Sequence, residues 1–265
     1  MKLIKKAVEI GNGAAVYVPK EYSGKEVVII LPEGVEEIKK RILNNLVEFM
    51  PNILGVYLYG SYARGEQETE SDVDVLIITK EKDNKIKIIL EDIDARVVSL
   101  DELKKTIRNY PLFIMPILRE AKTLLNPVLL EDLRNSSIDF RKFNWNFEDI
   151  GRIIKIAESF IKLDDKDISP SLIYSLIMRI RVCYIIECLL KGKEFSNKGV
   201  EKLLLSYGAD NKEIERFFHV YRLVRDEESP NIKINEGEVL VLLNILKDYL
   251  KKLKDETKKK IGERN

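Results

Sequence analysis

Two aspartates open an otherwise apolar segment of this chain, and a glycine-serine pair closes the apolar segment before it. Ile53 to Tyr59 is typical of a buried strand, and Gly60-Ser61 ends it abruptly. Residues 72–75, with the sequence Asp-Val-Asp-Val, begin a second apolar run. Because side chains alternate along a strand, the two aspartates are predicted to share one face, about 6.6 Å apart. The sequence therefore predicts paired carboxylates at a cleft, close to a turn whose backbone N–H groups can hold phosphate oxygens.

This layout resembles the signature of the DNA polymerase beta-type nucleotidyltransferase superfamily, in which an Asp-x-Asp strand follows a Gly-Ser turn. The resemblance implies that Gly60 and Ser61 cradle the triphosphate of a nucleotide. It also implies that Asp72 and Asp74 hold metal ions that bridge the triphosphate. Arg64 stands where the small bacterial and archaeal members carry Arg-Gly, and would add positive charge there. Either half of the motif alone is typical of an ordinary turn or a solvated edge strand, but their joint occurrence favours a nucleotidyltransferase.

The superfamily supplies a third carboxylate from a neighbouring strand, where it ligates a metal and can act as general base. Asp94 is the predicted candidate because it opens a short β-branched run that leads into a helix. Ser99 and Glu102 form a capping box that would begin this helix. Asp92 is the alternative, and an exposed loop acid is the ordinary interpretation of either aspartate. Arg96 shares the strand face of Asp94 and could pair with it.

Composition favours a globular enzyme over a dedicated nucleic-acid-binding protein. The 265 residues are 45% hydrophobic and 34% charged, which provides apolar material for packed cores. The 45 basic and 44 acidic residues nearly cancel, so the basic excess of a nucleic-acid binder is missing. Cys183 and Cys188 lie in a helical pattern and are predicted to be buried thiols, not a redox or metal pair. No apolar run suits a bilayer span or a signal peptide, so we expect a cytoplasmic protein.

The order of the predicted elements indicates an α+β fold in three parts. Residues 1–32 are predicted to form a small β module. Residues 33–127 are predicted to form a nucleotidyltransferase domain, a small mixed sheet backed by helices. In residues 128–265, apolar residues recur at helical spacing between short polar breaks. This part is predicted to form a bundle of four or five antiparallel helices.

The middle part contains further predicted elements around its aspartate strands. Apolar residues recur at helical spacing from Val35 to Phe49, and Pro51 ends the helix that they predict. A helix interrupted by prolines is predicted from Leu112 to Glu120. Lys122 to Leu125 is predicted to add an edge strand.

The N-terminal part carries no helical period and is predicted to form short strands. They run from Leu3 to Ile10, Ala14 to Pro19 and Val27 to Leu31, with glycine-containing turns between them. Residues 11–29 resemble the AbrB-type swapped-hairpin modules, in which paired chains form a small barrel that often contacts DNA. The lysines of this part could line a phosphate backbone, but glutamates are interleaved with them. A folding or dimerising accessory is therefore favoured over a DNA-binding module.

The C-terminal part, by its position and helices, resembles the helical domains of kanamycin-nucleotidyltransferase and HEPN proteins. Polar residues on two of its predicted helices could reach the cleft and meet the base or the acceptor. The ordinary interpretation, which we favour, is that they form surface ion pairs and pack the bundle. These residues are Tyr174, Arg179, Arg181, Tyr184, Glu187, Tyr221, Arg222, Arg225 and Asp226.

The predicted reaction transfers a nucleoside monophosphate from a nucleoside triphosphate, expected to be ATP, to an acceptor hydroxyl, with release of pyrophosphate. Two Mg²⁺ ions are the predicted cofactors. The acceptor is left open among a protein, an RNA and a small molecule; no membrane partner is expected, and the chain could form a homodimer. Two alternatives are a catalytically silent nucleotide- or RNA-binding regulator of the same fold and a DNA-binding protein acting through residues 1–32. The predicted catalytic and metal-binding residues are Asp72, Asp74 and Asp94, and the predicted nucleotide-binding residues are Gly60, Ser61 and Arg64.

Overall fold

The computed structural model describes residues 5, 7–28, 34–67, 72–83, 85–90, 93–162, 168–227 and 232–263. The chain divides into two compact units, Met1–Ile38 and Lys39–Asn265. The described residues combine a mixed four-stranded sheet with a helical C-terminal region, which confirms the predicted α+β class. The predicted division into three parts, with boundaries after residues 32 and 127, stays a prediction.

The described N-terminal residues contain a small hairpin. Strands β1 (Val8–Ile10) and β2 (Gly13–Ala15) pair antiparallel, and a 3-10 helix η1 (Lys20–Tyr22) follows them. The strand predicted from Val27 to Leu31 is wrong at its start, because residues 26–28 lie in no strand and Val28 is 92% exposed. No described strand pairs with these residues. The end of that predicted strand lies outside the described residues.

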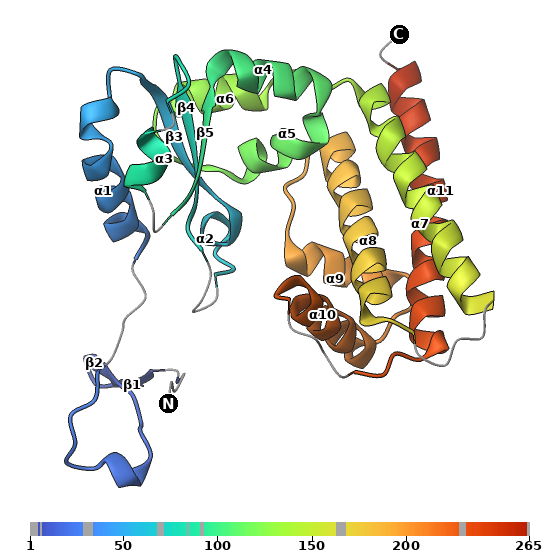
Figure 1. Ribbon diagram of the computed structural model, residues 1–265, viewed down its shortest axis with the longest axis horizontal. Helices are drawn as coiled ribbons and strands as arrows, with labels where there is room; N and C mark the ends of the chain where they lie inside the picture. The colour runs from blue at the N-terminus through green and yellow to red at the C-terminus, as the bar shows by residue number, and fades with distance from the viewer. Residues whose placement is uncertain are drawn as a thin grey trace. The chain divides into compact units, whose positions relative to one another are not determined.

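A four-stranded mixed sheet is the centre of the second unit (Figure 1). Its strand order is β5-β4-β3-β6; β4 and β5 are parallel, and the other two pairs are antiparallel. The strand predicted from residue 53 to 59 and the edge strand predicted from residue 122 to 125 are both confirmed. The strand predicted from Asp72 begins two residues later. The strands are β3 (Ile53–Tyr59), β4 (Asp74–Thr79), β5 (Asp94–Ser99) and β6 (Lys122–Leu125).

Helices precede, connect and follow these strands. The helix predicted ahead of the Gly-Ser strand is confirmed, and Ser99 and Glu102 form the predicted capping box at the start of α4. The predicted interruption after Leu112 is wrong: α5 is one helix that contains Pro116, and Pro111 stands in its first turn, where the missing N–H costs nothing. The helices are α1 (Val35–Asn45), η2 (Val47–Phe49), α2 (Gly60–Arg64), α3 (Lys85–Ile89), α4 (Leu100–Asn109), α5 (Pro111–Glu120) and α6 (Pro127–Arg134).

Five longer helices form the C-terminal region, and α7, α8 and α11 pack against one another along their lengths (Figure 1). Ser, Asp and Asn side chains cap the N-termini of α8 to α11. No helix in the described stretches is both long and apolar enough to cross a bilayer. The elements are η3 (Phe140–Phe143), α7 (Asn144–Lys162), α8 (Pro170–Lys191), α9 (Asn197–Ser206), α10 (Asn211–Arg225) and α11 (Glu236–Gly262).

The sheet and the helical region share one continuous cluster of buried side chains. Tyr57, Leu76 and Ile78 of the sheet belong to it, together with residues of α8 and α11 such as Leu176 and Leu246. Helix α5 links the two regions, because it contacts both β3 and α8. The Arg119 guanidinium at its end donates to the Cys188 carbonyl oxygen at 3.1 Å. The helical region is therefore packed against the sheet face that also carries the aspartates.

The two cysteines are free and buried on α8, as predicted. Burial raises the pKa of the Cys183 thiol to about 12, and burial also raises the pKa of Cys188. At pH 8 the thiolate fraction of Cys183 is therefore about 10⁻⁴.

We expect both thiols to react with a thiol-specific reagent at pH 8 only as fast as the chain unfolds, since the reactive thiolate is neither formed nor accessible. The measurement is the rate of colour release from Ellman's reagent in buffer and in denaturant. Fast release of one equivalent in buffer would contradict the buried placement.

Candidate active site

Asp74 and Asp94 begin two adjacent parallel strands and lie directly opposite one another. Asp74 is the first residue of β4, and its register partner on β5 is Asp94. Partners in adjacent strands point to the same face of a sheet, so the two carboxylates stand side by side. Asp72 precedes β4 and is exposed, whereas Val73 between the two aspartates is buried. This alternation of exposure agrees with the predicted shared face of Asp72 and Asp74.

The turn after β3 lies against Asp74. Gly60 has φ +74°, a left-handed conformation that favours glycine, and it follows Tyr59, the register partner of Asp74 on β3. A Cβ atom on Gly60 would lie 1.9 Å from Asp74 Oδ2. Only glycine therefore allows the turn to approach the carboxylate this closely. Ser61 is the next residue and is partly exposed.

Asp74 is surrounded by negative charge. Burial raises the pKa of Asp74 to about 6, and the charges of Asp94, Asp72 and Glu120 add to the increase, while Arg64 opposes it. Neighbouring carboxylates disfavour the ionised form of Asp74, and either a proton or a bound cation relieves this repulsion. The charges of Asp72 and Asp94 therefore both act on the Asp74 carboxylate.

Glu120, at the end of α5, is a residue of this site that the sequence interpretation did not include. Its Oε1 accepts a hydrogen bond from the Gly60 N–H at 2.9 Å, and its Oε2 accepts one from Arg64 Nη1 at 2.7 Å. The Glu120 side chain is 8% exposed, so this pairing is shielded from water. Sequence offers no local signal for this role, because Glu120 follows Gly60 by sixty residues.

Arg64 connects the turn to the helical region through a chain of polar contacts. Its Nε donates to Glu66 Oε2 at 2.9 Å, and the same oxygen accepts from Asn197 Nδ2 at 3.0 Å. Asn197 Oδ1 then accepts from Arg181 Nη1 at 2.9 Å. Burial lowers the pKa of Arg181, whose guanidinium lies 5.3 Å from the ring centroid of Phe195. Asn197 and Arg181 of the helical region are therefore linked to the turn through Glu66.

Most of the other polar residues considered on the helical region have partners within that region, in agreement with the ordinary interpretation. Arg179 pairs with Asp149 at 3.1 Å, and the rings of Tyr174 and Tyr221 stack with centroids 5.2 Å apart. Arg225 pairs with its neighbour in sequence, Asp226. These contacts stabilise helix packing.

Of the two predicted candidates for the third carboxylate, the structure describes only Asp94. Asp94 lies beside Asp74 as described, whereas Asp92 lies outside the described residues. Arg96 makes no ion pair with Asp94 in the described part of the chain; its guanidinium lies 4.7 Å from the ring centroid of Phe113. The carboxylate of Asp94 is exposed and free to meet a ligand.

The described residues contain no group of three or more His, Cys, Asp or Glu side chains arranged to hold a metal ion as they stand. The donors at the candidate site are nevertheless of the type that Mg²⁺ prefers, because they are carboxylate oxygens with two solvent-facing members. The mutual repulsion around Asp74 is the electrostatic condition that a divalent cation would relieve. The donor chemistry therefore fits Mg²⁺.

The nucleotidyltransferase domain family matches residues 37–202, which run from α1 through the sheet into α9. The chain belongs to this family. The predicted nucleotidyltransferase is confirmed at that level, and the matched residues include the Gly-Ser turn and all three predicted aspartates. Whether those residues carry the reaction stays a prediction.

Two proteins of Methanocaldococcus jannaschii, each with the name "Putative protein adenylyltransferase", are similar to this nucleotidyltransferase. One is 31% identical over 144 residues, covering 48% of this chain and 94% of the relative. The other is 33% identical over 110 residues, covering 40% of this chain and 95% of the relative. Among solved structures, spectinomycin adenyltransferase AAD(9) from Enterococcus faecialis, solved with ATP and spectinomycin, is 18% identical with a TM-score of 0.44, covering 83% of this chain and all of that one.

Proposed function

We propose that this nucleotidyltransferase transfers AMP from ATP to a hydroxyl group of a protein in a Mg²⁺-dependent reaction, with release of pyrophosphate. The observation that carries the proposal is the placement of Asp74 and Asp94 side by side on parallel strands, against a turn at Gly60 where an added Cβ would clash with Asp74. Two M. jannaschii relatives named as protein adenylyltransferases support adenylyl as the group and a protein as the acceptor.

Each site residue has a distinct role in this proposal. Asp72 and Asp74, with Asp94, would hold Mg²⁺, which when bound neutralises the triphosphate and polarises the acceptor oxygen. Asp94 is exposed and accepts the proton of the attacking hydroxyl. Ser61 donates its hydroxyl and N–H to phosphate oxygens. Its neighbour Gly60 already donates to Glu120, so a phosphate there must displace that carboxylate.

The proposal is tested by incubating the purified protein with each α-labelled nucleoside triphosphate, Mg²⁺ and a cell extract. We expect label from ATP to appear on protein, with one pyrophosphate released for each AMP transferred. Label on RNA or on a small molecule would contradict the proposed acceptor. Binding of ATP by calorimetry without any pyrophosphate release would contradict the enzyme and favour a silent regulator.

Glu120 is proposed to position Arg64 and the Gly60 N–H. Replacing Glu120 with alanine removes the acceptor of the Gly60 N–H and one of the two carboxylate partners of Arg64, so we expect about a tenfold higher KM for ATP and a less stable fold by about 1–3 kcal/mol. Glu120→Gln keeps an acceptor for the Gly60 N–H and should recover most of the stability. The measurements are KM, kcat and thermal unfolding.

The matched control for this prediction is Glu148→Ala, an exposed glutamate on α7. It should change neither KM nor stability. Equal KM values for Glu120→Ala and the wild type would show that Arg64 needs no positioning.

A further inference from the structure

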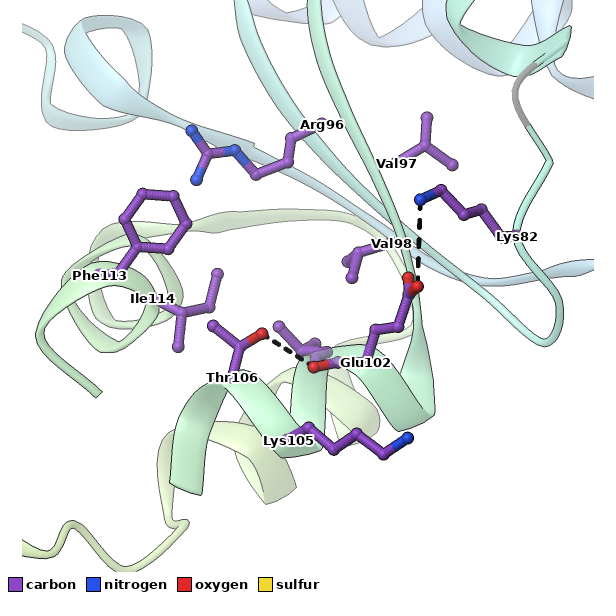
Figure 2. Close-up of a pocket in the computed structure, with 10 residues that line it drawn as sticks. Lys82, Arg96, Val97, Val98, Glu102, Lys105, Thr106, Phe113 and Ile114 are labelled. Carbon is purple, nitrogen blue, oxygen red and sulfur yellow. Dashed lines mark hydrogen bonds and ion pairs between the residues drawn. The ribbon is translucent and has the colours of Figure 1, made fainter. Parts of the chain in front are cut away.

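A cavity of about 490 Å³ lies between the edge strand β5 and helices α4 and α5 (Figure 2). Its volume is in the range of small-ligand sites. Figure 2 shows Arg96 of β5 and Phe113 of α5 on one side, with Lys82, Glu102 and Lys105 on the other. The apolar part of the lining comes from valines of β5 and from Leu103 and Ile114.

The charged groups of this cavity are predominantly positive. Three cations, Lys82, Arg96 and Lys105, line it together with one acid, Glu102. Glu102 Oε1 is 4.0 Å from Lys82 Nζ, so that acid is already associated with one of the cations. Arg96 and Lys105 therefore remain uncompensated by any other lining residue. Such a lining favours an anionic ligand over a neutral one.

The hydrogen-bonding capacity of the Arg96 guanidinium is only partly satisfied. Its Nη1 is buried and has no hydrogen-bond partner among the described residues. Buried donors are almost always paired, and an unpaired one is costly, most of all on a charged group. The face of the guanidinium is already covered by the Phe113 ring at 4.7 Å. Arg96 lines the cavity, so a carboxylate that enters it would form a charge-assisted hydrogen bond with the guanidinium.

The cavity adjoins the candidate active site on the side away from the Gly-Ser turn. Arg96 follows Asp94 by two residues on β5 and so shares its face of the sheet. In the strand order β5-β4-β3, the turn extends from β3, Asp74 stands on β4, and the cavity borders β5. A nucleotide held at the turn and a ligand held in the cavity would therefore approach Asp74 and Asp94 from opposite sides.

We infer that this cavity binds an acidic side chain of the protein acceptor, close in sequence to the hydroxyl that receives AMP. The inference rests on the proposed function and deepens it by assigning the acceptor an acidic determinant. The carboxylate meets Arg96, with Lys105 adding positive charge across the cavity, while the neighbouring hydroxyl reaches Asp94. Specificity for the acceptor thus resides in β5 and α4, apart from the residues that hold the nucleotide.

The test uses two fluorescent peptides that differ only in charge: one serine flanked by glutamates, and the same peptide with glutamines. We expect the full chain to bind the glutamate peptide at least tenfold more tightly in an anisotropy titration, with affinity that falls as salt is added. Arg96→Gln should weaken that binding about tenfold and Lys105→Gln about threefold. Lys104→Gln is the matched control, because Lys104 is exposed on the same helix and does not line the cavity.

Three outcomes would overturn the inference: equal binding of the two peptides, an equal loss in Lys104→Gln, or weaker ATP binding in Arg96→Gln without a change for the peptide. The last result would place the nucleotide in the cavity. Pyrophosphate release by the wild type from ATP and Mg²⁺ in the presence of the cell extract, which supplies the acceptor, is measured in parallel. Its absence would contradict the proposed function, whereas its presence without selective peptide binding would contradict the acidic determinant alone. Thermal unfolding of each variant checks that it folds.

Discussion

Replacing Asp74 with asparagine is expected to reduce nucleotidyl transfer by about a thousandfold or more while the chain stays folded. Asp74 stands between Asp94 on one neighbouring strand and the Gly60 turn on the other. Its loss removes the central ligand of the proposed Mg²⁺ site, and a thousandfold loss corresponds to about 4 kcal/mol of transition-state stabilisation. Asparagine has nearly the same shape, so the packing of β4 is kept.

The stability of this variant is expected to equal or exceed that of the wild type, because one of several mutually repelling carboxylates is removed. Pyrophosphate release, with thermal unfolding of the same samples, measures both effects. Asp132→Asn, at an exposed aspartate on α6, is the matched control and should keep full activity. Wild-type rates with normal Mg²⁺ dependence in Asp74→Asn would remove Asp74 from the mechanism.

Gly60→Ala is expected to lower activity about a hundredfold and to destabilise the chain by about 2–4 kcal/mol. Two penalties combine at this position. The backbone has φ +74°, which strains any residue with a Cβ, and the new Cβ would lie 1.9 Å from Asp74 Oδ2. The turn or the carboxylate must therefore move, and either movement separates Asp74 from the residues that hold the phosphates.

Gly65→Ala separates the two penalties. Gly65 ends the same short helix with φ +68°, but a Cβ there would meet nothing within 4 Å. This variant should lose about 1 kcal/mol of stability from backbone strain and keep its activity. Activity assays and denaturant unfolding of both alanine variants give the comparison. Similar activity in the two variants would show that the close approach of Gly60 to Asp74 has no catalytic consequence.

Sequence periodicity predicted most elements of the second unit because their signals are local. The apolar run from Ile53 to Tyr59 gave both ends of β3, and the Ser99–Glu102 capping box gave the start of α4. The predictions were wrong where the outcome depends on tertiary contacts with another element. Val27 and Val28 have strand-forming side chains but no described strand beside them, and Pro116 is tolerated in α5 because the helix is packed into the core on both sides of it.

The sequence by itself determined that Asp74 and Asp94 stand at strand starts, with Asp72 just before the first of them and a glycine turn upstream, because alternation and turn chemistry act over a few residues. Only the tertiary structure decided that Asp94 lies opposite Asp74, that Glu120 reaches Gly60, and that Glu66 contacts Asn197 across 131 residues. It also turned Arg96 toward Phe113 and left one of its nitrogens without a partner in the described residues. The physical reason is that strand order, register and helix packing set these distances, and a register shift of one residue would reverse every face while leaving each local pattern unchanged.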